Sequence, residues 1–302
     1  MGAALGSVLR EAGTVVLWAS SGRRAATALR AETADLRDVG SVDELSRRSE
    51  LIVSVCPPDA ALDVARSVSG FEGIFVDVNA VSPATARAVA AAIETGGGRY
   101  VDGGIVGPPP WSPGTTRLYL SGPAAQDVAG LFASTVVDAR VVSGRLGAAS
   151  ALKMAYAAWT KGTAALLLAI RALARVQDVE AALLEEWNTS VPGLQEQSLR
   201  AAHSACGKGW RWVGEMQEIA STFGSVDLPA GFHHAAAEIF RKAPRLDDAH
   251  ADDQTLERVL LALPMRIVPC MLGGKGWFRL DRLCPRGDLD QTCDAWCGCD
   301  SG

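Results

Sequence analysis

The sequence lacks three features that would place it in common functional classes. Its apolar stretches, such as residues 164–170, are far too short to cross a bilayer. It has no excess of positive charge, since 29 Lys and Arg residues stand against 34 Asp and Glu residues, which excludes a broad nucleic-acid-binding surface. Its N-terminus has no basic region followed by an apolar one, as a secretory signal would. We therefore expect a cytoplasmic protein without a membrane or nucleic-acid partner.

Motifs for several kinds of site are also missing. There is no Gly-Lys-Ser/Thr phosphate loop and no Ser-His-Asp grouping with a nucleophile elbow. The adjacent residues His233 and His234 point in different directions on a helix, so they make a poor metal pair. The C-terminal stretch is rich in cysteine, but its spacing is not the paired Cys-x-x-Cys of a typical zinc site. We predict no metal site, with a zinc site as the alternative at Cys284, Cys293, Cys297 and Cys299.

Short β-branched runs alternate with helical segments through the first half of the chain. This alternation predicts right-handed βαβ units and a Rossmann-type, doubly wound parallel sheet. After residue 147 helical periodicity dominates to about residue 242, with breaks at residues 191–193 and 227–229. Strands are expected at residues 14–18, 51–55, 74–78, 100–102 and 117–120, and helices at residues 3–12, 20–32, 59–68 and 82–94.

These patterns divide the chain into three parts. Residues 1–146 are expected to form a dinucleotide-binding, Rossmann-like domain, and residues 147–243 an all-helical domain for substrate binding and dimerisation. Residues 244–302 are expected to be an atypical, Cys-rich and disordered tail. The helical part is apolar around much of its circumference, notably at residues 164–173. Because such a helix needs partners on more than one face, we expect it to be buried against other helices on several sides.

The first strand of a Rossmann domain is missing from the pattern. Such a domain begins with a strand, a Gly-x-Gly-x-x-Gly turn and then a helix. In this chain the helical pattern comes first, preceded only by Met1 and Gly2. Gly2 fits the third glycine of the fingerprint, so the first strand and the first two glycines are expected upstream.

One lysine lies where a long apolar helix begins. The segment that leads to it, residues 144–153, is rich in glycine and alanine and ends in Lys153. A buried lysine is costly as a cation, so its pKa falls toward neutrality. Lys153 is therefore a candidate proton-transfer group beside a hydride acceptor. The alternative is a lysine whose head extends from the helix end into solvent.

Five segments, taken in order and spacing, resemble one enzyme family: residues 1–5, 51–58, 75–83, 101–108 and 144–153. Over residues 2–242 the chain resembles the β-hydroxyacid dehydrogenases, and more closely the 6-phosphogluconate-dehydrogenase-like NAD(P)-dependent oxidoreductases. The resemblance implies a small-molecule substrate, a homodimer and a catalytic Lys153. It implies cofactor contacts by Gly2, Cys56, Pro57 and Asn79, and substrate contacts by Asp102, Gly103, Gly104, Val106, Gly107 and Tyr156.

The chain departs from the family pattern at several positions. Ala149 replaces a glycine, Ala157 replaces an asparagine, and Val106 replaces the serine that helps to hold a substrate carboxylate. A Lys-Asp pair of the helical domain is absent from residues 211–213. The residues leave four hypotheses: hydride transfer on a hydroxy acid or sugar acid, imine reduction, a nonenzymatic or degenerate dinucleotide-binding protein, and a helical interaction protein.

The turn after the expected strand at residues 14–18 bears on the cofactor. An acidic residue at this place normally binds the ribose 2′-hydroxyl of NAD. This chain instead has Ser20, Ser21, Arg23 and Arg24, with no carboxylate among them. Two arginines can pair with a 2′-phosphate, so the sequence predicts NADP, with NAD as the alternative. The competing interpretation is a solvated helix start with two surface arginines.

Overall fold

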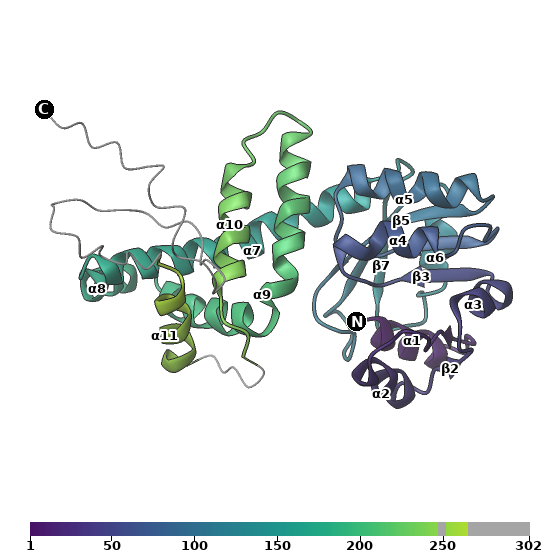
Figure 1. Ribbon diagram of the computed structural model, residues 1–302, viewed down its shortest axis with the longest axis horizontal. Coiled ribbons are helices and arrows are strands. Elements are labelled where there is room, and N and C mark those ends of the chain that lie inside the picture. The colour runs from purple at the N-terminus through teal and green to yellow at the C-terminus, as the bar shows by residue number, and fades with distance from the viewer. Residues whose placement is uncertain (247–251, 265–302) are drawn as a thin grey trace, which may run out of the picture. The chain divides into compact units, whose positions relative to one another are not determined.

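Five strands of the first half form the main sheet (Figure 1). The computed structural model of the chain describes residues 1–246 and 252–264. The strand order is β3-β4-β5-β6-β7. Pairing is parallel from β3 through β5 and between β6 and β7, so the predicted α/β class is confirmed. The strands are β3 (Leu51–Ser54), β4 (Ile74–Asp77), β5 (Arg99–Val106), β6 (Arg117–Ser121) and β7 (Asp138–Ser143).

The β5–β6 pair departs from the expected parallel sheet, because these two strands run antiparallel. Residues 107–116 join them and contain no helix. A parallel return needs a crossover of about a dozen residues or more, usually with a helix. The short connection therefore folds back as a hairpin, and the expectation of uniformly parallel strands was wrong at this pair.

The N-terminal strands form a second, separate sheet. β1 (Leu17–Trp18) pairs in parallel with β2 (Arg37–Asp38), and neither strand belongs to the five-stranded sheet. β1 is shorter than the run expected at residues 14–18, and Val15 is 75% exposed. A strand with one short partner has few backbone groups to pair with, so β1 ends after two residues.

Helices cover both faces of the main sheet. Leu5 and Val8 of α1 share one core cluster with Val128 of α6, whereas Ala65 of α4 and Val89 of α5 belong to another. As the sequence predicted, a serine begins α5, followed by a proline at the first helical position. The helices are α1 (Gly2–Glu11), α2 (Ala25–Thr33), α3 (Val42–Arg48), α4 (Ala61–Arg66), α5 (Pro83–Thr95) and α6 (Ala125–Gly130), with a 3-10 turn η1 (Pro58–Ala60).

The second half is helical, and its long helices pack around their own core (Figure 1). Met154 and Leu168 of α7 meet Ile219 of α9 and Phe240 of α10 in that core. The expected breaks at residues 191–193 and 227–229 separate α8 from α9 and α9 from α10. The helices are α7 (Ala148–Val176), α8 (Glu180–Ser190), α9 (Leu194–Gly224), α10 (Gly231–Lys242) and α11 (Asp253–Ala262).

Helix α11 corrects the expectation of disorder throughout the tail. Asp252 caps this helix by accepting the backbone N–H of Thr255 at 2.8 Å. Leu256, Val259 and Leu260 enter the helical core. Their spacing of three and four residues builds one apolar face, so the helical half extends past residue 243. The cysteines of the proposed zinc alternative lie outside the described residues.

Helix α7 belongs to both halves. It is 29 residues long, begins against β5, β6 and β7, and continues into contact with α9 and α10. The halves also meet where the Glu218 carboxylate of α9 accepts the backbone N–H of Ser82 at 2.6 Å and the Thr85 hydroxyl at 2.8 Å. In the part of the chain that the structure describes, no helix has the length and apolarity needed to span a membrane.

Candidate functional site

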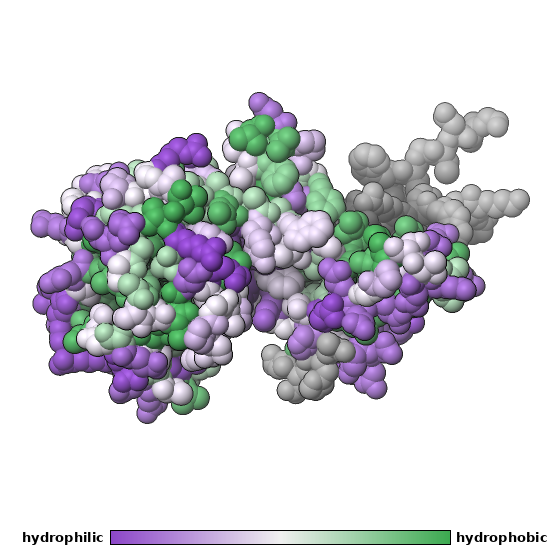
Figure 2. All heavy atoms as spheres, turned by 180° about the vertical axis from the view of Figure 1, so that it is seen from behind, coloured by the Kyte–Doolittle hydropathy of each residue, from purple (hydrophilic) through white to green (hydrophobic). Residues whose placement is uncertain are grey.

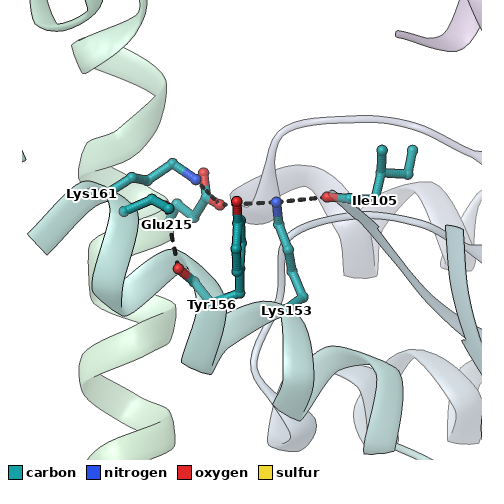
Figure 3. A network of polar contacts seen from close by, with 6 residues as sticks. Ile105, Lys153, Tyr156, Lys161 and Glu215 are labelled. Atoms are coloured by element: carbon teal, nitrogen blue, oxygen red, sulfur yellow. Dashed lines mark hydrogen bonds and ion pairs between the residues drawn. The ribbon is translucent and has the colours of Figure 1, made fainter. Parts of the chain in front are cut away.

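Lys153 lies on the second turn of α7, pressed against strand β5. Gly147, with φ at +87°, precedes the helix. Gly104 of β5 permits the close approach, because a Cβ atom there would stand 2.9 Å from the Lys153 Cβ and 3.1 Å from the Ala149 carbonyl oxygen. The Lys153 ammonium donates to the Ile105 carbonyl oxygen at 2.8 Å (Figure 3). Strand β5 thus holds both the stem and the head of this lysine.

The environment of Lys153 lowers the pKa of its ammonium. Its side chain is 15% exposed, and burial, aided by the positive charge of Lys161, lowers the pKa from 10.5 to about 8. The Glu215 carboxylate opposes this effect from 3.8 Å. A lysine in this range can accept and return a proton near neutral pH. The alternative of a solvated lysine head does not fit this burial.

Lys161 and Glu215 form an ion pair beside Lys153 (Figure 3). Glu215 is 10% exposed at its side chain and approaches from α9. The Lys161 ammonium also stands 5.8 Å from the centre of the Trp212 ring. Sequence reasoning missed Glu215, because the lysine–acid pair of the family was sought at residues 211–213. The sequence indicated only Lys161 of this pair. It follows Lys153 by about two helical turns, so the two lysines lie on one face of α7.

Tyr156 is the exposed polar group of this site, with 46% of its surface accessible. It follows Lys153 by three residues, so both side chains rise from the same face of α7 (Figure 3). Gly107, another residue predicted to bind substrate, is also exposed and has φ at +117°. A Cβ atom at Gly107 would stand 2.1 Å from the Thr115 carbonyl oxygen, so only glycine fits this turn.

The other residues predicted to bind substrate lie inside the fold. Asp102 has no exposed surface, Val106 is 3% exposed, and Gly103 and Gly104 are buried. The Asp102 carboxylate accepts the Ser121 hydroxyl at 2.8 Å, the Ser150 backbone N–H at 3.0 Å and the Ser150 hydroxyl. Because these bonds occupy both oxygens, direct substrate contact by Asp102 is corrected to a buried contact between the sheet and α7.

Asn79 and Cys56 lie where β4 and β3 end, as expected, but Asn79 is 3% exposed. Its side-chain oxygen accepts the Cys56 backbone N–H at 2.5 Å, and its amide donates to Ser54 Oγ at 3.0 Å. The Asn79 side chain therefore joins the two strand ends instead of facing a ligand. Burial raises the pKa of the Cys56 thiol to about 11, so the thiol is neutral, and Pro57 beside it is exposed.

The expected cofactor edge also includes the start of α1 and the turn after β1. Gly2 is exposed and begins α1, and a Cβ atom there would meet only the Val55 side chain, at 3.5 Å. Ser21, Arg23 and Arg24 are exposed, and Ser20 is half-buried. The start of a helix suits an anion, and exposed arginines can pair with one.

Asp38 corrects the expectation that this turn has no carboxylate. Its Oδ1 accepts the backbone N–H of Ser20 at 3.2 Å and that of Gly40 at 2.8 Å. A side-chain hydrogen bond with Ser20, followed by the backbone bond from Gly40, lowers the pKa of Asp38. The pairing of β1 with β2 brings this acid to the turn, and the spacing of 18 residues gave no local signal.

Within the described ranges no cluster of potential metal ligands occurs.

Comparisons with known proteins show what the chain is similar to. Residues 174–243 match a family model described as a domain of unknown function, DUF1932. An uncharacterised 28.5 kDa protein of Methanothermus fervidus is 32% identical over 143 residues, which are 47% of this chain. The match spans only 55% of that protein.

Solved structures share the fold over most of the chain. The protein MTH1747, described as structurally similar to 3-hydroxyacid dehydrogenases, is 27% identical with a TM-score of 0.60, over 80% of this chain and 93% of that one. The 3-hydroxyisobutyrate dehydrogenase of Mycobacterium tuberculosis is 17% identical with a TM-score of 0.63, over 88% and 96%. An imine reductase of Myxococcus stipitatus, solved with NAD+, is 21% identical with a TM-score of 0.50, over 86% and 96%.

Proposed function

We propose that this chain, which has the fold of the 3-hydroxyacid dehydrogenases, is an NADP-dependent oxidoreductase with Lys153 as its general acid and base. The observation that carries the proposal is the buried ammonium of Lys153, whose pKa lies at about 8. The proposed substrate is a hydroxy acid or a sugar acid, oxidised at the carbon that bears its hydroxyl. When bound, the nicotinamide supplies or accepts the hydride.

The residues of this chain move the proton. In oxidation the neutral Lys153 amine accepts the substrate hydroxyl proton, and in reduction the ammonium returns it to the new hydroxyl. The Ile105 carbonyl oxygen, 2.8 Å from Nζ, orients the amine. Beside this amine, the positive charge of Lys161 and the negative charge of Glu215 offset each other. Tyr156 offers an exposed hydroxyl on the same helix face for a substrate oxygen.

The predicted cofactor edge fits a dinucleotide phosphate at several points. The first amides of α1 start beside Gly2, where the backbone is open to an anion. Arg23 and Arg24 are exposed and suit a 2′-phosphate, which favours NADP. Asp38 at the same turn is the group that favours NAD.

Replacement of Lys153 by methionine tests the function. We expect turnover to fall by at least about a hundredfold, the usual contribution of a general base, while NADPH affinity by fluorescence titration stays within about twofold. Lys208→Met is the matched control, because Lys208 is an exposed lysine of α9. Full turnover in the Lys153 variant would contradict the proposal.

Two other functions have support of their own. The fold similarity to an imine reductase, with valine at position 106 and alanine at position 157, supports imine substrates. Strands β1 and β3 belong to two separate sheets, and this separation supports a dinucleotide-binding protein without enzymatic activity. A panel of hydroxy acids, sugar acids and cyclic imines separates these functions. Turnover of imines alone selects the first, and NADPH binding without turnover selects the second.

The exposed apolar side chains of the helical half support a homodimer. Trp159 is 71% exposed, Leu173 63%, Val226 63% and Phe232 48%. Hydrophobic residues gather at the end where α9 and α10 meet (Figure 2). Apolar side chains left at the surface favour association, and a second copy is the proposed partner. Light scattering at micromolar concentration should give twice the chain mass, and a monomer would contradict the assignment.

A further inference from the structure

We propose that Asp102, Ser121 and Ser150 form a buried clamp that positions Lys153 by fixing the start of α7 to the sheet. The inference rests on the proposed function and assigns these three residues no contact with substrate. They come from three separate elements, β5, β6 and α7. All three have no exposed surface.

The start of α7 has no side-chain cap of its own. Gly147 occupies the cap position, so the first amides of the helix need acceptors from elsewhere. Ser121 Oγ accepts the Ala149 N–H at 3.0 Å, and Asp102 Oδ2 accepts the Ser150 N–H at 3.0 Å. Strands of the sheet thus supply the cap, and the position of the helix start depends on them.

The clamp places a negative group where the helix favours one. The N-terminal end of a helix carries partial positive charge, which a carboxylate offsets. A buried carboxylate also requires several hydrogen bonds, since it has lost its water. Asp102 has them from the hydroxyls of Ser121 and Ser150 and from the Ser150 amide. Loss of either hydroxyl leaves the Asp102 carboxylate short of a donor.

Strand β5 connects the clamp to Lys153. Asp102 and Gly104 stand two residues apart, so they face the same side of the strand. Asp102 binds the first turn of α7, Gly104 contacts the Lys153 stem, and the next residue, Ile105, accepts its ammonium. Lys153 follows Ser150 by three residues, which is nearly one helical turn. A shift of the helix start therefore moves the lysine along this strand.

The test measures the pKa of Lys153 directly, by trace acetylation of the full chain at a series of pH values and mass spectrometry of the Lys153 peptide. Ser150→Ala and Ser121→Ala each remove one hydroxyl without changing the charge. Ser198→Ala is the matched control, because Ser198 is also fully buried and accepts from Arg171 at 2.8 Å, within the helical half.

We expect a pKa of about 8 for Lys153 in the parent protein and in the Ser198 control. In the two clamp variants we expect it to rise by about one unit or more, because a loosened helix start lets water reach the ammonium. Thermal unfolding and circular dichroism verify that each variant is folded. If both folded clamp variants keep the parent pKa, the clamp does not position Lys153, and the proposal is wrong.

This measurement does not depend on turnover. If the clamp variants shift the pKa of Lys153 but the parent protein turns over no substrate, the clamp is supported and the proposed function is refuted. Turnover that depends on Lys153, combined with an unshifted pKa in the clamp variants, would support the function and refute the clamp. With an active protein, kcat of the clamp variants should fall while KM for NADPH stays unchanged, because the cofactor edge is untouched.

Discussion

Replacing Asp77 with asparagine should stabilise the protein at neutral pH and not at acidic pH. Asp77 ends β4, is 1% exposed, and lies opposite Asp102 in the strand register. Burial, followed by repulsion from Asp102, raises the pKa of Asp77 from 3.8 to about 6. Its Oδ1 accepts the Asn79 backbone N–H at 3.0 Å, and its Oδ2 accepts the Tyr100 hydroxyl at 3.5 Å. An asparagine keeps an oxygen for the Asn79 N–H.

The magnitude follows from the two pKa values. Because the pKa in the folded state lies above its unfolded value of 3.8, ionisation of Asp77 opposes folding. This destabilisation is absent below about pH 4, grows between about pH 4 and pH 6, and is complete above that range. A difference of about two pH units corresponds to about 3 kcal/mol. Asp77→Asn removes this cost at pH 8 and changes little at pH 4.

Urea denaturation of both proteins at pH 4, 6 and 8 measures this effect. We expect the variant to exceed the parent by about 2–3 kcal/mol in free energy of unfolding at pH 8, and by less than about 0.5 kcal/mol at pH 4. Asp59→Asn is the control, because Asp59 is an exposed aspartate, and such substitutions stay within about 0.5 kcal/mol. Parallel stability curves for Asp77→Asn and the parent protein would refute the reasoning.

Three further predictions concern the site. Glu215→Gln removes the group that raises the pKa of Lys153, so that pKa should fall below about 8 by trace acetylation, and an unchanged or higher value would contradict the ion pair. The double change of Arg23 and Arg24 to alanine should weaken NADPH binding tenfold or more by fluorescence titration, since each charge-assisted contact contributes about 1.5–3 kcal/mol; equal affinity of the parent for NADP and NAD would count against these arginines. Gly104→Ala should lower stability in urea by about 1–3 kcal/mol, because its Cβ would overpack against α7, and an unaltered midpoint would show that the helix gives way.

The sequence predicted those parts of the fold that local pattern determines. The runs at residues 51–55 and 74–78 became β3 and β4, because β-branched residues in a row suit a strand buried on both faces. The start of α5 could also be predicted, because an N-cap serine and the fixed φ of a proline both act within one helical turn. Two-residue β2 and six-residue α6 are too short to show a period, and they were missed.

The candidate site depended on contacts between distant segments, which local pattern does not contain. Lys153 could be named as a candidate because its helix and glycine-rich start are local features. Glu215 stands 54 residues from Lys161, its closest partner, and Asp38 reaches Ser20 through the pairing of two short strands. Asp102 was expected at the end of a strand but lies inside β5, and its hydrogen bonds come from serines 19 and 48 residues away.

The continuity of α7 determines how the two halves can move. A helix of 29 residues rises by about 1.5 Å per residue, and its backbone hydrogen bonds run unbroken from the sheet into the helical core. Bending it sharply would require proline, an inserted group or broken bonds, and α7 has no proline. The two halves are therefore joined by a stiff helix, whereas many two-domain enzymes have a hinge between their domains. Large closure of one half onto the other is therefore disfavoured.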